Sequence, residues 1–222
     1  MTLARPHHLE IEGTRVFCRG RRVHALVDMT PRPSDTALYR CFKMGGLLLL
    51  NDSIDLIFGD KQNLALLSEN ADSPLLSSEE RELVRRHVPW TRRLADREVV
   101  YAGRRARLLD LVLGEQDRMV VKPGMDFGGK GVYLGRATSD AEWRRAVDAA
   151  LDEGSWVVQE ALESRPYLFQ AGPEGCSPHD VIWGPFVFGG EYAGLILRVQ
   201  PKSVDGAVNL SLAATEGIVF EL

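Results

Sequence analysis

Long apolar runs and cysteines are both scarce in this sequence. The apolar stretch from Gly45 to Leu50 is far too short to span a bilayer, and the N-terminus lacks the apolar region of a secretory signal peptide. The three cysteines, Cys18, Cys41 and Cys176, lie far apart and form no CxxC pair. This spacing argues against a zinc site and favours a reduced compartment. We therefore expect a cytoplasmic protein that does not enter the membrane.

An excess of positive charge is also missing. The formal net charge is -4 and the pI is near 5.8, so no global basic field would attract nucleic acid, and we expect none as a partner. The five histidines show no ligand spacing, which disfavours a histidine metal site. What remains is ordinary for a soluble globular protein: 222 residues, 45% hydrophobic and 26% charged, enough for one large or two small domains.

The first fifty residues show patterns of strands and one helix. Alternating apolar and polar residues from Leu9 to Leu26 predict a β-hairpin that turns at Arg19-Gly20. The basic residues at this turn are read as solvent-facing, with phosphate binding as the alternative. A short helix is predicted from Ser34 to Phe42. The continuous apolar run from Leu47 to Leu50 predicts a buried strand.

A helix over Gln62 to Glu69 is predicted to begin with Asp60 as its N-cap. Lys61 then falls in the first turn, where a cation is unfavourable beside the positive end of the helix dipole unless an anion offsets it. Lys61 is therefore a candidate phosphate ligand, and simple solvent exposure is the alternative.

Two further helices are predicted before residue 118. Ser77 and Glu80 form a capping-box pattern for a helix that continues to His87. Apolar residues at helical spacing predict another from Arg104 to Leu113, with its arginines on the solvent-facing side.

The run VVKPGMDFGGKGVYLG, which starts at Val120, is the most informative stretch. It predicts a strand that ends at Lys122-Pro123, a loop rich in glycine, and a second strand from Val132 to Leu134. Glycines at 124, 128, 129 and 131 would let the backbone present its amides to phosphate oxygens, while Lys122 and Lys130 add positive charge. The alternative is a plain hairpin turn. The run matches neither GxGxxG before a helix nor GxxxxGK[ST].

A helix and a third strand follow this loop. Thr138 or Ser139, with Glu142 completing a capping box, starts the helix, which stops before Gly154. Trp156 to Glu160 then reads as a buried strand with two polar residues at its end, Gln159 and Glu160. An adenine edge, which needs one donor and one acceptor, would account for them.

Together, VVKPGMDFGGKGVYLG, the tryptophan-containing helix and WVVQEAL resemble the ATP-grasp superfamily, in particular its glutathionylspermidine-synthase-like and circularly permuted branches. The resemblance implies that Lys122 holds nucleotide phosphate and that the loop covers the phosphates. It also makes Lys61 the counterpart of an earlier nucleotide lysine and Glu163 a candidate ribose ligand. The implied nucleotide-binding residues are Lys61, Lys122, Gly128, Gly129, Lys130, Gly131, Gln159, Glu160, Ala161 and Leu162.

The C-terminal region predicts a hairpin from Asp180 to Val199 that turns at Gly189-Gly190, after a loop from Gly172 to Pro178 and before a strand from Ala207 to Ser211. The resemblance implies that Asp180 and Asn209 are magnesium ligands, since carboxylate and amide oxygens suit Mg²⁺, and that Arg198 binds phosphate and acts in catalysis with Lys122. The alternatives are a structural Asn209 and an Arg198 that pairs with a carboxylate. Ala207 stands where family members usually carry an acidic metal ligand.

These features predict an α+β protein with the ATP-grasp fold, in which two α+β subdomains with antiparallel sheets clamp a nucleotide. The expected parts are an N-terminal hairpin and strand segment (1–50), a helical linker region (51–118), a subdomain with the glycine-rich loop (119–162) and a C-terminal sheet (163–222). The resemblance covers about Leu47 to Ser211.

The implied activity is that of an ATP- and Mg²⁺-dependent ligase. It would join a carboxylate to an amine or thiol through an acylphosphate, with small-molecule or peptide substrates and a partner domain or subunit. The alternatives are a nucleotide-binding module without catalysis, which Ala207 and the short N-terminal region favour, and an interaction protein that binds no nucleotide.

Overall fold

The computed structural model of the protein describes residues 5–27, 36–50, 54–126, 128–170, 175–204, 208, 214–217 and 219. The backbone divides into two compact units, Met1–Asp60 and Lys61–Leu222. Both combine helices with sheets that are mostly antiparallel, so the predicted α+β class is confirmed. Within the described ranges, every helix is too short or too polar to cross a membrane.

A three-stranded antiparallel sheet opens the first unit. A 3-10 helix, η1 (Pro6–His8), leads into β1 (Leu9–Glu12), β2 (Arg15–Cys18) and β3 (Arg21–Val23). The predicted turn at Arg19-Gly20 joins β2 to β3, but the single predicted hairpin is wrong. Another turn at Gly13, where φ is 60°, separates β1 from β2. Apolar and polar residues keep alternating through both turns, so the sequence pattern does not reveal the turn at Gly13.

The rest of the first unit holds a small core. The strand β4 (Ala25–Val27) pairs in parallel with β5 (Leu48–Leu50), and the helices are α1 (Ala37–Lys43) and α2 (Ile54–Gly59). Thr36 caps α1, close to the predicted start. The strand predicted at Leu47 to Leu50 is present as β5, and Leu47 is buried as expected, at 3% exposed. Burial of the whole run is wrong, because a two-stranded sheet leaves a face open: Leu48 is 54% exposed and Leu50 45% exposed.

The second unit is built on a four-stranded antiparallel sheet with the order β10-β9-β11-β6. These strands are β6 (Thr91–Arg93), β9 (Met119–Pro123), β10 (Tyr133–Leu134) and β11 (Trp156–Glu160), and the last three agree with prediction. Apolar side chains on one face of the sheet pack with residues of two helices to form the core. The largest core residues are Leu94, Leu108, Met119, Trp143 and Trp156.

The helices of this unit follow their capping signals. The capping box of Ser77 and Glu80 is present at the start of α4 (Ser78–His87). Ser139 caps α6 (Asp140–Glu153), and Gly154 ends it with φ 77°. The other helices are α3 (Gln62–Glu69) and α5 (Leu108–Gly114), with 3-10 turns η2 (Gln116–Arg118) and η3 (Gly135–Ala137).

The predicted helix from Arg104 is wrong in its first turn. Residues Arg104–Arg107 form β8, which pairs with β7 (Glu98–Tyr101), and the helix begins at Leu108. Ala102 and Gly103, with φ 48° and 77°, make the tight turn that joins the two strands. The pairing between these strands therefore outweighs the helical propensity of arginine. The three arginines remain exposed, as expected.

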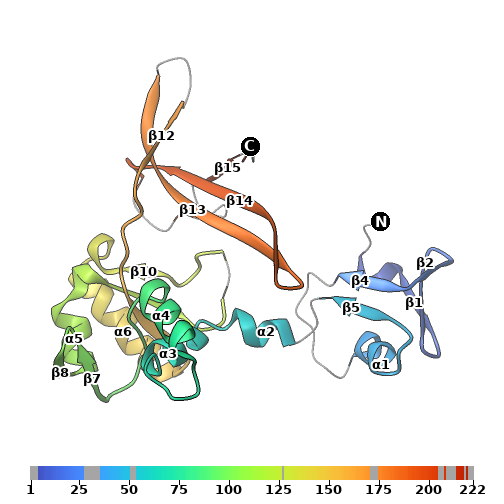
Figure 1. Ribbon diagram of the computed structural model, residues 1–222, viewed down its shortest axis with the longest axis horizontal. Helices are drawn as coiled ribbons and strands as arrows, with labels where there is room; N and C mark the ends of the chain where they lie inside the picture. The colour runs from blue at the N-terminus through green and yellow to red at the C-terminus, as the bar shows by residue number, and fades with distance from the viewer. Residues whose placement is uncertain are drawn as a thin grey trace. The chain divides into compact units, whose positions relative to one another are not determined.

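A second sheet has the order β12-β13-β14-β15, with β12 (Tyr167–Gln170), β13 (Cys176–Phe188), β14 (Glu191–Pro201) and β15 (Thr215–Gly217). The turn at Gly189-Gly190 agrees with prediction, and β13 and β14 form a long ribbon (Figure 1). The loop predicted from Gly172 to Pro178 ends earlier than expected, because β13 starts at Cys176. Apart from Val208, the predicted strand from Ala207 to Ser211 lies outside the described residues.

Candidate functional site

The glycine-rich loop has a backbone that requires glycine. Gly128, Gly129 and Gly131 have φ values of 72°, 75° and 67°, in the left-handed region that residues with a Cβ rarely enter. At Gly131 a Cβ would also lie 3.3 Å from the Pro123 ring. The loop is therefore a specifically shaped turn after β9, with Lys130 exposed on it.

Lys122 is a half-buried cation at the base of this loop. Its Nζ donates to Oε1 of Gln159 at 2.6 Å, and no carboxylate pairs with it in the part of the chain that the structure describes. Burial, reinforced by the nearby charge of Lys61, lowers the pKa of Lys122 to about 8. The ammonium is thus largely removed from water with a neutral amide as its partner, an arrangement that is unfavourable without an anion.

Lys61 connects α3 to the start of the loop. Its Nζ donates to the backbone oxygens of Gly124 at 3.3 Å and Asp126 at 2.8 Å, and its backbone N–H donates to Gly124 O at 3.0 Å. The predicted N-cap at Asp60 is wrong. Lys61 occupies the N-cap position with helical φ and ψ of -66° and -14° and makes no side-chain capping bond. Because Lys61 is held by loop carbonyls, the structure brings together Lys61, Lys122 and the loop, as the sequence predicted.

Gln159, from the expected adenine-binding strand, has partners within the protein at both ends of its amide. Its Nε2 donates to Oγ1 of Thr91 at 2.7 Å, while its Oε1 accepts from Lys122. The Thr91 hydroxyl in turn donates to Pro89 O at 2.8 Å. These bonds explain a buried polar residue at this strand position without an adenine.

Glu160 points to the other face of the sheet. Its carboxylate accepts from the Tyr101 hydroxyl at 3.1 Å and lies 3.5 Å from Arg118. Burial and this bond raise the pKa of Tyr101. The next backbone N–H, at Ala161, donates to Arg118 O at 2.8 Å, and Leu162 is 68% exposed. These contacts leave the Glu160 side chain engaged away from Lys122.

Glu163, the candidate ribose ligand, is exposed and pairs with Arg136 at 3.0 Å.

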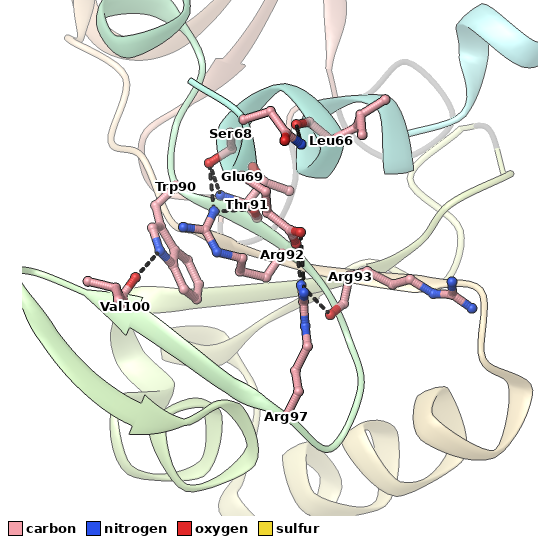
Figure 2. A network of polar contacts seen from close by, with 10 residues as sticks. Leu66, Ser68, Glu69, Trp90, Thr91, Arg92, Arg93, Arg97 and Val100 are labelled. Carbon is pink, nitrogen blue, oxygen red and sulfur yellow. Dashed lines mark hydrogen bonds and ion pairs between the residues drawn. The ribbon is translucent and has the colours of Figure 1, made fainter. Parts of the chain in front are cut away.

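A polar network that the sequence did not reveal fixes α3 against β6 (Figure 2). The Ser68 hydroxyl accepts from the Thr91 N–H at 3.0 Å and from the Arg92 guanidinium at 2.9 Å. That guanidinium lies 4.7 Å above the Trp90 ring, and its burial lowers the pKa of Arg92. An ion pair between Glu69 and Arg97 adds a second link to α3. The network therefore holds in place both the helix that carries Lys61 and the strand that carries Thr91.

A cavity of about 560 Å³ lies beside β6, and neither Lys61 nor Lys122 is among its lining residues. Arg93, in its lining, donates to Gly154 O at 3.2 Å, and Arg97 is engaged by Glu69. Both basic groups that face this cavity already have partners. The lining residues are Arg93, Leu94, Ala95, Asp96, Arg97, Leu151 and Gly154.

The second sheet carries the predicted metal ligand Asp180, which the structure places beside a cation. Its Oδ1 accepts from the Ser164 hydroxyl at 2.6 Å and from Lys202 Nζ at 3.1 Å. Burial acts to raise the pKa of Asp180, but the two bonds and the positive charges of Lys202 and Arg136 together outweigh it and hold the pKa below its usual value. Asn209 and Ala207 lie outside the described residues.

The described residues do not fit a magnesium site. Over those ranges, no three His, Cys, Asp or Glu side chains gather where they could hold a metal ion, and the Asp180 oxygen is already used by an ammonium group.

Arg198 lies on β14, opposite Ile182 of β13 and Glu216 of β15, and is half-buried. Among the residues with described contacts, neither Arg198 nor Asp180 bonds to Lys122. The structure therefore brings Lys61, Lys122 and the loop together, and the binding roles of these residues and of Arg198 stay predictions.

No protein-family model and no curated protein matches the sequence. A solved structure that aligns with this one is D-alanyl-alanine synthetase A from Vibrio cholerae O1 biovar eltor, with a TM-score of 0.44 and 11% sequence identity. The alignment covers 88% of this chain and 52% of that chain, so this chain spans about half the length of the synthetase. The fold and site described above define an α+β protein with a cationic site under a glycine-rich loop.

Proposed function

We propose that the protein binds ATP, with its phosphates at Lys61, Lys122 and the loop from Gly128 to Gly131. The observation that carries the proposal is the Lys122 ammonium, which is half-buried and has a neutral hydrogen-bond partner. Lys61 lies close enough for its charge to lower the pKa of Lys122. Phosphate oxygens would neutralise both lysines, and the amides of a left-handed glycine turn are suited to cradle them.

The ATP-grasp resemblance extends this proposal to an activity. ATP would phosphorylate a carboxylate of a small molecule or peptide, and an amine or thiol would attack the acylphosphate. Lys61, Lys122 and Lys130 would stabilise the transferring phosphoryl group by charge, and Arg198 is proposed to add to it from β14. The backbone from Glu160 to Leu162 is proposed to hold adenine. Within the superfamily, we propose a place near the glutathionylspermidine-synthase-like and circularly permuted branches, because the run from Val120 resembles theirs.

Magnesium would shield the phosphate charges when bound with ATP. Since Asp180 is held by Lys202 and Ser164, binding of a metal there would require Lys202 to move away. No step of the proposed reaction depends on a metal at Asp180.

A nucleotide-binding module without turnover is the second candidate. The observation that favours it is the pairing of Asp180 with Lys202 in place of an acidic cluster, together with Ala207 in the sequence. In that case ATP would bind and act as a ligand for a partner domain or subunit.

One assay separates the two candidates. The full chain is mixed with ATP and Mg²⁺ and with sets of carboxylates and amines, and the release of ADP is followed. Turnover that depends on both an acid and an amine supports the ligase. ATP binding without turnover supports the module. The matched control is Lys43→Met, because Lys43 is an exposed lysine of α1. Loss of binding in Lys122→Met, but not in this control, locates the site.

A further inference from the structure

We propose that Thr91 is a positioning residue for Lys122: through the amide of Gln159, its hydroxyl fixes the acceptor toward which the Lys122 ammonium points. The three side chains lie on three adjacent strands, β6, β11 and β9. Gln159 stands opposite Thr91 on one side and Val120 on the other, which places Lys122 diagonally across from it on the same face of the sheet. The consequence for nucleotide binding rests on the function proposed above.

Each hydrogen bond in the series from Lys122 through Gln159 and Thr91 to Pro89 can run in only one direction, because the groups at its two ends have fixed roles as donor or acceptor. The Pro89 carbonyl can only accept, so the Thr91 hydroxyl must donate to it and must accept from Gln159. At the other end the Lys122 ammonium can only donate, so Gln159 must present its carbonyl oxygen to it. The two requirements agree on one orientation of the Gln159 amide.

Burial makes this orientation matter. Thr91 is fully buried and Gln159 is 8% exposed, so water is a poor substitute for either partner. If the Thr91 hydroxyl is removed, the amide NH₂ of Gln159 loses its acceptor. Rotation of the amide would then turn the NH₂ group toward Lys122, where two donors face each other. The charged form of Lys122 would lose its one described acceptor, beside the charge of Lys61 that already opposes it.

The described side-chain bonds of Lys61 reach the loop. Its Nζ donates to the carbonyls of Gly124 and Asp126, which fixes the loop, and its charge lowers the pKa of Lys122 without setting the direction of the Lys122 hydrogen bond. The backbone N–H of Thr91, in contrast, donates to the Ser68 hydroxyl, so α3 holds the strand that presents the Thr91 side chain to Gln159.

The test measures the pKa of Lys122 in the full chain by NMR of ¹³C-labelled lysine, with the resonance assigned from its loss in Lys122→Met. Thr91→Val keeps the shape of the side chain and removes the hydroxyl. We expect the pKa of Lys122 to fall by about one pH unit, which lowers the protonated fraction at pH 8 from about one half to about one tenth. ATP binding at pH 8 should then weaken by about fivefold.

Two controls make the result specific. Thr91→Ser restores a hydroxyl and should return the pKa to the wild-type value. Thr138→Val removes a comparable bond, from the Thr138 hydroxyl to Leu134 O at 2.8 Å, without touching Gln159, and should leave the pKa of Lys122 unchanged. An unchanged pKa in Thr91→Val, or an equal change in Thr138→Val, overturns the positioning role.

If Thr91→Val fails to fold, the wild-type chain supplies a second measurement. The side-chain amide protons of Gln159 should exchange slowly with solvent and shift as Lys122 titrates, and fast exchange without a shift overturns the proposal. Because these readouts need no nucleotide, failure of ATP to bind the wild-type chain rejects the proposed function separately.

Discussion

Replacing Lys122 with methionine should stabilise the second unit at neutral pH while it removes nucleotide binding. Methionine has a similar length and no charge, and Val120 and Val157 nearby are buried apolar residues. The substitution therefore removes a charge from a site in which burial disfavours it.

The size of the effect follows from the pKa. Lowering the pKa of Lys122 from 10.5 to about 8 corresponds to about 3 kcal/mol of stability lost when the group is charged. Methionine leaves the carbonyl oxygen of Gln159 without its donor, which costs about 1–2 kcal/mol. The net gain expected at pH 7 is thus about 1–2 kcal/mol in the free energy of unfolding.

The effect of Lys122 on the free energy of unfolding changes with pH in the opposite direction to that of a lysine in an ion pair. Because the folded pKa lies below the unfolded one, the unfolded chain binds more protons between about pH 8 and 10.5. The wild-type penalty is therefore complete below pH 8 and disappears as the pH rises toward 10.5. The advantage of Lys122→Met should disappear over the same range.

Urea unfolding followed by tryptophan fluorescence is a suitable assay, because all four tryptophans belong to the second unit. They are Trp90, Trp143, Trp156 and Trp183. Measurements at pH 7 and 10 compare the wild-type chain with Lys122→Met and with Lys43→Met. A Lys122→Met protein that is less stable than wild type at pH 7, by an amount that does not vary with pH, refutes the reasoning.

Two other predictions concern the surroundings of the site. Gly135→Ala should destabilise the second unit by about 2 kcal/mol or more, because a Cβ would lie 1.8 Å from the backbone oxygen of Gln116; Gly114→Ala, with no neighbour within 4 Å, is the matched control in the same urea assay. Lys202→Met should raise the pKa of Asp180, whose stabilising effect is present at neutral pH and lost as the pH falls through that pKa. Carboxyl ¹³C NMR checks this, and an unchanged pKa would count against the pairing.

Local signals in the sequence predicted much of this fold. Ser77 and Ser139 cap α4 and α6 as expected, and Gly154 and the Gly189-Gly190 pair end a helix and turn a hairpin. Each of these signals depends on side chains and φ angles within a few residues, so it can be read without knowing the tertiary structure. The strand at Arg104–Arg107 could not be read in this way, because its pairing with β7 is what makes it a strand.

The residues of the candidate site could likewise be predicted where the signal is local and were missed where it depends on tertiary contacts. Lys61, Lys122 and the glycines were predicted from charge and spacing, and the structure brings them together. Thr91 was missed, since a threonine in a strand is common and its role depends on a hydrogen bond to Gln159, 68 residues away in sequence. The magnesium-ligand role of Asp180 stays a prediction, and its partner Lys202, which directly follows β14, could not be predicted from the sequence because the contact depends on tertiary structure.

Calorimetric titration of the full chain with ATP at pH 8.5, in two buffers of different ionisation enthalpy, tests the central claim most directly. At this pH about three quarters of Lys122 is unprotonated. Phosphate bound beside it should raise its pKa, so we predict that ATP binding takes up close to one proton. Lys122→Met should abolish both the uptake and most of the affinity, while Lys43→Met should preserve them. No binding at all, or binding without proton uptake that survives Lys122→Met, would contradict the account.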